Sequence, residues 1–212
     1  IRQATDALNA YEHSKALEVI ESFFWQFCDD YIELVKNRAY GTADAHGKVP
    51  SDAAVKSART TLGLGLDAFA RLLAPYLPFA TEEVWSWMHT GEGSVHRAAW
   101  PKADIYAAAA TGASPETLAW AGKAVEQLRK IKSEAKVSMK TPILSVTLAA
   151  VKDGIDAIKS ALDDVAQAGR VIGKFDLAEK HAEEATAEGE GDDTVVIDAS
   201  ELGEPPAKKA KK

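Results

Sequence analysis

The hydrophobic pattern is strongest between Ala16 and Tyr40, where apolar side chains recur at alternating steps of three and four. This spacing places them in one line along a helix, with charged and amide side chains on the opposite side. A helix this aromatic needs partners on more than one side, so we expect it to be the central member of a helical bundle. The line consists of Leu17, Ile20, Phe24, Phe27, Tyr31 and Leu34, widened by Phe23, Cys28, Ile32 and Val35.

Further helical spacing follows over residues 51–75, and a short helix is expected from a Thr81 cap to Gly91. Gly63 and Gly65 each cost about 1 kcal/mol in a helix relative to Ala. We therefore expect close helix packing at these glycines. Residues 94–100 have the pattern of an extended segment that Pro101 ends.

The period changes after Pro142, where apolar residues alternate over 144–148, 171–177 and 194–198 as in strands. One helix is expected between the first two strands, over 153–169, and the acidic stretch 181–193 is expected to form a hairpin loop. The fold class is thus mainly α, an antiparallel helical bundle followed by a small α+β subdomain. The predicted organisation is a bundle over 1–101, an Ala-rich linker over 102–113, the α+β subdomain over 114–200 and a disordered Lys-rich tail over 201–212.

Composition narrows the class of protein. The 212 residues include one cysteine, Cys28, which cannot form an internal disulfide, so nothing indicates a secreted scaffold. No apolar run approaches the roughly 20 residues that span a bilayer. We expect a cytoplasmic, monomeric protein. Because the chain lacks an initiator Met and opens with a helical pattern, we also expect it to be part of a longer protein.

The net charge of −7 argues against a generic nucleic-acid binder, but the excess is localised. Residues 176–204 hold 11 acidic residues and one lysine. Removing them from the chain's 25 basic and 32 acidic residues leaves 24 and 21. The helical part is therefore compatible with an RNA partner.

No catalytic constellation is present in the sequence. The five histidines are scattered, without ligand spacing to Cys28 or to a pair of carboxylates, and Gly63-Leu64-Gly65 lacks the strand that precedes a phosphate-binding loop. Asp29 and Asp30 are adjacent and so point in different directions along a helix. We predict no catalytic, cofactor-binding or metal site in this chain.

Two sets of residues have the chemistry to bind RNA, through stacking, hydrogen bonds and phosphate contacts. For the first set, the end of the long helix, the residues alone favour an ordinary solvated helix end. For the second, a basic helix face after Pro115, a solubilising role is equally compatible. The first set is Gln26, Lys36, Asn37, Arg38 and Tyr40; the second is Lys123, Arg129, Lys130, Lys132, Lys136 and Lys140.

Three ordered runs resemble motifs of the valyl-tRNA synthetases, class I enzymes. Residues 23–33, Phe-Phe-Trp-Gln-Phe-Cys-Asp-Asp-Tyr-Ile-Glu, are similar to the signature that begins the anticodon-binding bundle of that family. Residues 72–85 resemble its Leu-Leu-His-Pro-x-x-Pro-Phe-(Ile/Leu)-Thr-Glu-Glu-(Leu/Ile)-Trp run, with Ala74 in place of His. Residues 98–101 resemble the Ala-x-Trp-Pro that closes the domain, and residues 128–137 match a later helix more loosely.

The resemblance implies a fragment that docks the anticodon arm of valine tRNA, beside missing catalytic and editing domains that use ATP and Mg²⁺. The catalytic motifs His-Ile-Gly-His and Lys-Met-Ser-Lys-Ser are absent from this sequence. An isoleucyl-type synthetase and a non-catalytic helical protein-interaction module remain alternatives. The expected tRNA contacts are Gln26, Lys36, Asn37, Arg38 and Tyr40 on the bundle, with Arg129, Lys130 and Lys132 on phosphates.

Overall fold

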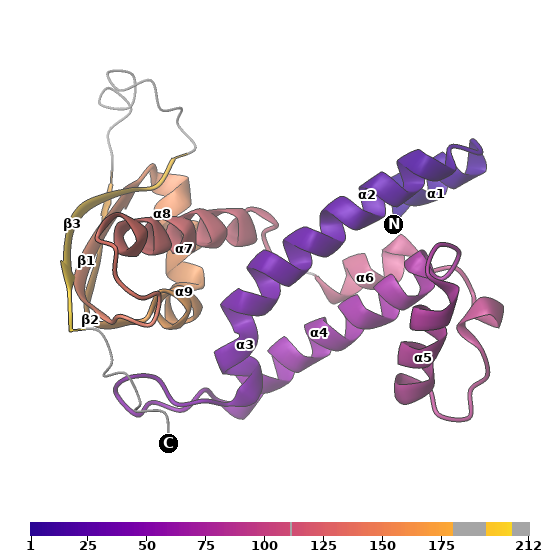
Figure 1. Ribbon diagram of the computed structural model, residues 1–212, viewed down its shortest axis with the longest axis horizontal. Helices are drawn as coiled ribbons and strands as arrows, with labels where there is room; N and C mark the ends of the chain where they lie inside the picture. Colours follow the sequence, from indigo (N-terminus) through magenta and orange to yellow (C-terminus); the bar gives the residue numbers. More distant parts are fainter. Residues whose placement is uncertain (111, 180–193, 205–212) are drawn as a thin grey trace. The chain divides into compact units, whose positions relative to one another are not determined.

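The computed structural model describes residues 1–110, 112–179 and 194–204, which form two compact units (Figure 1). The first unit comprises Ile1–Ile32 and Ala53–Ala113, and the second comprises Glu33–Asp52 and the chain from Ser114 onward. This division differs from the boundaries expected from sequence, because the end of the long helix and the loop after it group with the second unit. The predicted fold class is confirmed, with helices first and a small mixed sheet after them.

The first unit is helical throughout. Its core joins Ala4, Ile20, Phe69 and Leu72, and Phe24 and Phe27 pack against this cluster. The long helix therefore packs against two neighbours in this unit, as its aromatic content predicts. The elements are α1 (Arg2–Asn9), α2 (His13–Gln26), a π-helical segment (Phe27–Ile32), α4 (Asp52–Leu73), α5 (Pro78–Met88), a 3₁₀ turn (Val95–Arg97) and α6 (Ala103–Ala109).

Gly65 confirms the expectation of close packing, whereas Gly63 does not. A Cβ atom at Gly65 would lie 2.5 Å from Cζ of Phe27, inside van der Waals contact. At Gly63 a Cβ atom would meet no atom of the described chain within 4 Å. The Phe27 ring, which belongs to the π-helical segment, thus sits directly on the backbone of α4.

Three expectations for this unit were wrong. Helix α5 begins at Pro78 rather than at a Thr81 cap, because proline suits the first helical turn, and the Thr81 hydroxyl instead donates to the Leu77 carbonyl at 2.9 Å. The expected extended segment contains the 3₁₀ turn, capped by Ser94. The expected linker contains α6, favoured by its alanines, and Tyr106 of that helix donates a hydrogen bond to Asp67 of α4 at 2.9 Å.

Among its described residues, the second unit packs helices on a three-stranded sheet of order β2-β1-β3 (Figure 1). β2 runs parallel to β1 and β3 runs antiparallel to it. Buried residues of β1 and the helices, such as Leu128, Leu148 and Ile158, fill the core. The elements are α3 (Glu33–Tyr40), α7 (Glu116–Glu134), β1 (Ile143–Ala150), α8 (Lys152–Ser160), α9 (Leu162–Gly169), β2 (Val171–Glu179) and β3 (Val196–Leu202).

The second unit corrects two further expectations. The connection from β1 to β2 holds two helices, α8 and α9, separated at Ala161, instead of one. β3 also extends to Leu202, past the expected start of the tail. The acidic stretch 181–193 and residues 205–212 of the tail lie outside the described residues.

Within the described part of the chain, no helix combines the length and apolar character needed to cross a bilayer.

Candidate nucleic-acid interface

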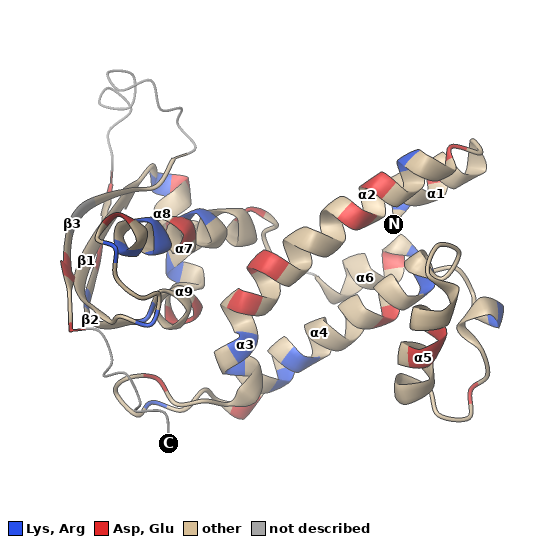
Figure 2. Cartoon of the chain, viewed as in Figure 1, with Lys and Arg blue, Asp and Glu red and all other residues tan. Residues whose placement is uncertain are grey.

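Helix α3 carries four of the expected contact residues. It continues without a break from α2 through the π-helical segment and ends at Tyr40. The next residue, Gly41, has a φ of 70°, the left-handed conformation typical of the position after a helix. Figure 2 shows basic residues on α3, which also carries the acidic Glu33, whereas α2 and the π-helical segment carry more acidic than basic residues. Of the three segments of this helix, α3 therefore has the charge that most favours an anionic ligand.

Lys36 and Arg129 share one carboxylate. Lys36 Nζ lies 2.7 Å from Glu33 Oε2, and the Arg129 guanidinium lies 3.7 Å from the same oxygen. All three side chains are more than two-fifths exposed, so this surface pairing contributes little stability. The shared carboxylate brings the Arg129 cation of α7 beside the Lys36 cation of α3. In the sequence, these two residues belong to separate sets.

Tyr40 and Lys130 are exposed. The Tyr40 side chain is 80% accessible at the end of α3, and Lys130 lies on the exposed side of α7. An accessible phenol can stack on a base, and an accessible ammonium can approach a phosphate.

Arg38 has a structural partner. Its guanidinium makes two contacts with Asp164 of α9, 3.1 Å from Nε to Oδ1 and 2.9 Å from the terminal nitrogen to Oδ2. The side chains are only 24% and 12% exposed. Burial raises the pKa of Asp164, and the Arg38 charge opposes that rise. Arg38 thus holds α3 against α9.

Lys132 is buried, which corrects its assignment as a phosphate contact. The residue is 2% exposed, and its ammonium group donates to the carbonyls of Gly169 at 2.8 Å and Met139 at 3.3 Å. Burial, together with Arg170 and Arg129, lowers the pKa of Lys132 to about 8. A phosphate cannot reach this group without opening the packing between α7 and α9.

Gln26 belongs to the first unit. It is exposed at the end of α2 and lines a cavity of about 620 Å³ together with Lys15, Ser22 and Phe23. Phe23 is 55% exposed although its ring lies 5.7 Å from that of Phe69. The polar flank of α2 therefore combines an accessible amide with an accessible aromatic ring.

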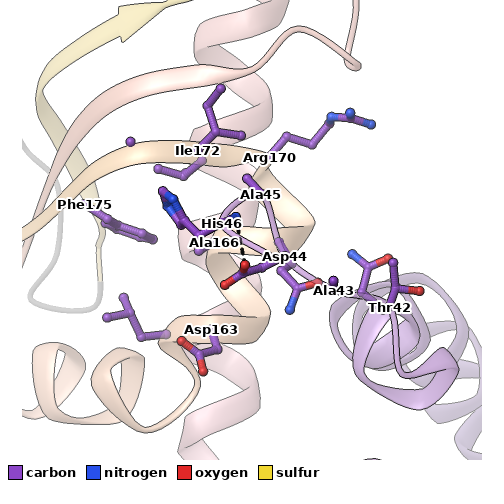
Figure 3. A pocket seen from close by; sticks show the side chains of 15 residues that line it. Thr42, Ala43, Asp44, Ala45, His46, Asp163, Ala166, Arg170, Ile172 and Phe175 are labelled. Carbon is purple, nitrogen blue, oxygen red and sulfur yellow. Dashed lines mark hydrogen bonds between the residues drawn. The ribbon is translucent and has the colours of Figure 1, made fainter. Parts of the chain in front are cut away.

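Asn37 lines a second cavity, of about 460 Å³, within the second unit (Figure 3). Its walls come from the loop after α3, from α9 and from the start of β2, and they include His46, Arg170 and Phe175. No sequence pattern predicted this cavity, because the loop after α3 is more than 100 residues away along the chain from α9 and β2.

In the described part of the chain, no three His, Cys, Asp or Glu side chains are placed to hold a metal ion.

Comparison with known proteins places these features in a family. Residues 1–148 match the family model described as the anticodon-binding domain of tRNA ligase. The whole chain is 78% identical to a valine–tRNA ligase of Bifidobacterium longum and 42% identical to that of Cutibacterium acnes, covering 23% and 22% of their lengths. A valine–tRNA ligase of Thermobifida fusca is 44% identical over 81% of this chain, which covers 18% of that relative.

The chain thus spans less than a quarter of the length of these relatives. Their names agree with the valyl-tRNA synthetase resemblance of the three sequence motifs. From the family match over most of its length, the chain belongs to the anticodon-binding domains of tRNA ligases.

Proposed function

We propose that this chain binds the anticodon arm of valine tRNA as the C-terminal region of a valine–tRNA ligase. The observation that carries the proposal is 78% identity over the whole chain to a valine–tRNA ligase, together with the family match. In the longer enzyme, catalytic and editing domains would attach valine to the tRNA with ATP and Mg²⁺. This region would supply affinity and orientation, so that the acceptor end of the tRNA enters a distant active site.

The contacts we propose in the second unit are Lys36, Asn37 and Tyr40 of α3 with Arg129 and Lys130 of α7. The exposed side chains of Tyr40, Arg129 and Lys130 support this assignment, as does the shared approach of Lys36 and Arg129 to Glu33. Asn37 is half-buried in the wall of the second cavity. Lysine and arginine position the phosphate backbone, whereas Asn37 and Tyr40 have the chemistry to contact bases. Arg38 acts as a positioning residue through Asp164, and Lys132 is left out because it is buried.

In the first unit we propose Gln26 as a hydrogen-bonding contact. Its accessible amide beside the Phe23 ring supports this role, since bases that have left a stack are bound by amides and aromatic faces.

The direct test is binding of the whole 212-residue chain to valine tRNA and to a tRNA with the middle anticodon base changed. Each is measured at about 50 and 200 mM salt, since phosphate contacts release counterions and make affinity fall steeply with salt. We expect the base change to weaken binding and both complexes to be salt-sensitive. Equal binding to the two tRNAs would contradict anticodon recognition and reduce the chain to a nonspecific RNA-binding surface.

Lys130→Ala tests the surface on α7. If Lys130 contacts a phosphate, the slope of log K against log salt should fall by about 1, with similar loss for both tRNAs. Lys102→Ala is the matched control, because Lys102 is also exposed but lies in the first unit, outside the proposed contacts. Identical slopes for the two variants would remove Lys130 from the interface.

A further inference from the structure

The 460 Å³ cavity of the second unit has the size and lining of a ligand pocket (Figure 3). Pockets for small ligands occupy roughly 300–1,000 Å³ and combine apolar walls with a few polar groups. Here the apolar walls include Ile172 and Phe175 of β2, and the polar groups include the amides of Asn37 and Gln167. The His46 ring points toward Phe175 and Ile172, and the Arg170 side chain extends away from it at the edge of the pocket (Figure 3).

The loop that carries His46 is held in place. The Asp44 carboxylate oxygen Oδ1 accepts backbone N–H bonds from His46 at 2.8 Å and Lys48 at 2.9 Å. Lys48 Nζ lies 2.7 Å from Asp163 of α9. The ion pair of Arg38 with Asp164 fixes the preceding helix to the same α9. The Arg38–Asp164 pair thus fixes the helix before the loop, and the Asp44 hydrogen bonds order the loop itself, so less ordering is needed when a ligand enters.

The charged groups around the pocket are compatible with the binding of an anionic ligand at one edge. Asp44 and Asp163 line the cavity, but backbone N–H groups and Lys48 compensate them. The backbone hydrogen bonds from Lys48 and His46 lower the pKa of Asp44, and the same bonds order the loop. Arg170 brings a guanidinium to the rim, where a phosphate would remain in solvent.

We propose that this pocket receives a single unstacked nucleotide of the tRNA, with its base against His46 and Phe175 and its phosphate at Arg170. This proposal rests on the proposed function, because it requires that the chain binds tRNA. Its chemistry is that of single-stranded recognition, in which a base leaves the stack, lies on a ring and hydrogen-bonds its edge to side chains. Asn37 and Gln167 are the amides placed to contact such an edge.

The test compares the binding of the whole chain and two variants to a valine-tRNA transcript. His46→Ala removes the stacking ring and should weaken binding about 5- to 150-fold, since one stacked base contributes roughly 1–3 kcal/mol. His46→Phe keeps a flat ring and should retain the affinity. The matched control is His13→Ala, because His13 is an exposed histidine in the first unit.

A set of transcripts with one loop nucleotide made abasic then identifies the occupant. Wild type should lose at least as much affinity on one abasic transcript as His46→Ala loses on the intact tRNA, and His46→Ala should lose less on that transcript than wild type does. If His46→Ala binds every transcript as wild type does, while Lys130→Ala still lowers the salt slope, the pocket is not a nucleotide site and the proposed function stands. If wild type binds no tRNA, both proposals fail.

Discussion

Lys130 and Lys132 are two residues apart on α7, yet their chemistry differs completely. Lys130 is exposed, whereas Lys132 lies four residues after Leu128 on the face that packs inward. Its ammonium group donates to the last carbonyl of α9, at Gly169, which a helix end leaves without an intrahelical partner. One lysine is available to a ligand, and the other joins two helices.

Lys132→Met should remove a pH dependence of stability. The pKa of Lys132 falls from 10.5 to about 8 on folding, so the unfolded chain binds more protons between these values and stability rises with pH across this window. Below about pH 8 the full cost of burying the charge is present. Relative to Lys132→Met, the unfolding free energy of wild type should increase by about 3 kcal/mol from pH 8 to 10.5.

Urea denaturation of both proteins across this pH range measures the difference. Lys130→Met, on the same helix but exposed, is the control and should follow wild type. A difference between wild type and Lys132→Met that does not change with pH would show that the ammonium is solvated in the folded protein.

The elements of each unit are joined by contacts that helix propensity alone does not predict. Phe27 packs on Gly65, so the π-helical segment and α4 approach more closely than a larger residue would allow. In the second unit, Arg38 and Asp164 join α3 to α9. Each contact can be tested with a matched position on the same element.

Gly65→Ala should destabilise the protein although alanine favours helices. The added Cβ would lie 2.5 Å from Phe27, which must move; overpacking of this kind costs about 1–3 kcal/mol. Gly63→Ala, two residues earlier, meets nothing within 4 Å and should stabilise by about 0.5–1 kcal/mol. Thermal unfolding of the two variants gives the comparison, and melting temperatures that shift in the same direction would contradict the packing argument.

Arg38→Ala should cost about 1–3 kcal/mol, because it leaves the mostly buried Asp164 carboxylate without its cation. The double variant Arg38→Ala/Asp164→Ala should recover part of that loss, since the uncompensated charge is gone. The exposed pair Lys48–Asp163 is the control, and its removal should cost less than about 1 kcal/mol. Additive losses in the Arg38–Asp164 cycle, measured by denaturant unfolding, would mean that the two side chains do not interact.

At the scale of the whole molecule, the proposed function requires an acidic chain to bind an anion. The acidic excess is concentrated in residues 176–204, and the remainder is slightly basic. Salt screens the repulsion between charges over a distance of about 10 Å at 0.1 M. We therefore expect the negative charge of residues 176–204 to oppose RNA binding most strongly at low ionic strength.

Neutralising six acids should strengthen tRNA binding at low salt and leave base discrimination unchanged. Changing each Glu to Gln and each Asp to Asn moves the net charge from −7 to −1. The gain should vanish at high salt because screening removes the field. A variant with Glu→Asp changes at the four glutamates keeps the charge and serves as control; a gain there would exclude the electrostatic explanation. The six positions are Glu183, Glu184, Glu188, Glu190, Asp192 and Asp193.

The sequence by itself determined the long helix from Ala16 to Tyr40, the helix over residues 51–75 and the change from helical to strand period after Pro142. It did so because the periods of 3.6 and 2 are local properties of the chain. It also carried the motifs by which the resemblance to the valyl-tRNA synthetases was identified. The inward position of Lys132 could also have been predicted, because Lys132 follows Leu128 by one helical turn. Its charge led instead to the prediction of an exposed phosphate contact.

Only the tertiary structure decided which residues meet. Arg38 and Asp164 are 126 residues apart, and the pocket around His46 has walls from a loop, a helix and a strand that no periodicity connects. The order β2-β1-β3 likewise depends on the chain returning to β1, which a local pattern cannot specify. Hydrophobic spacing sets which side of an element is buried, whereas the partner of that side is chosen by packing across the whole unit.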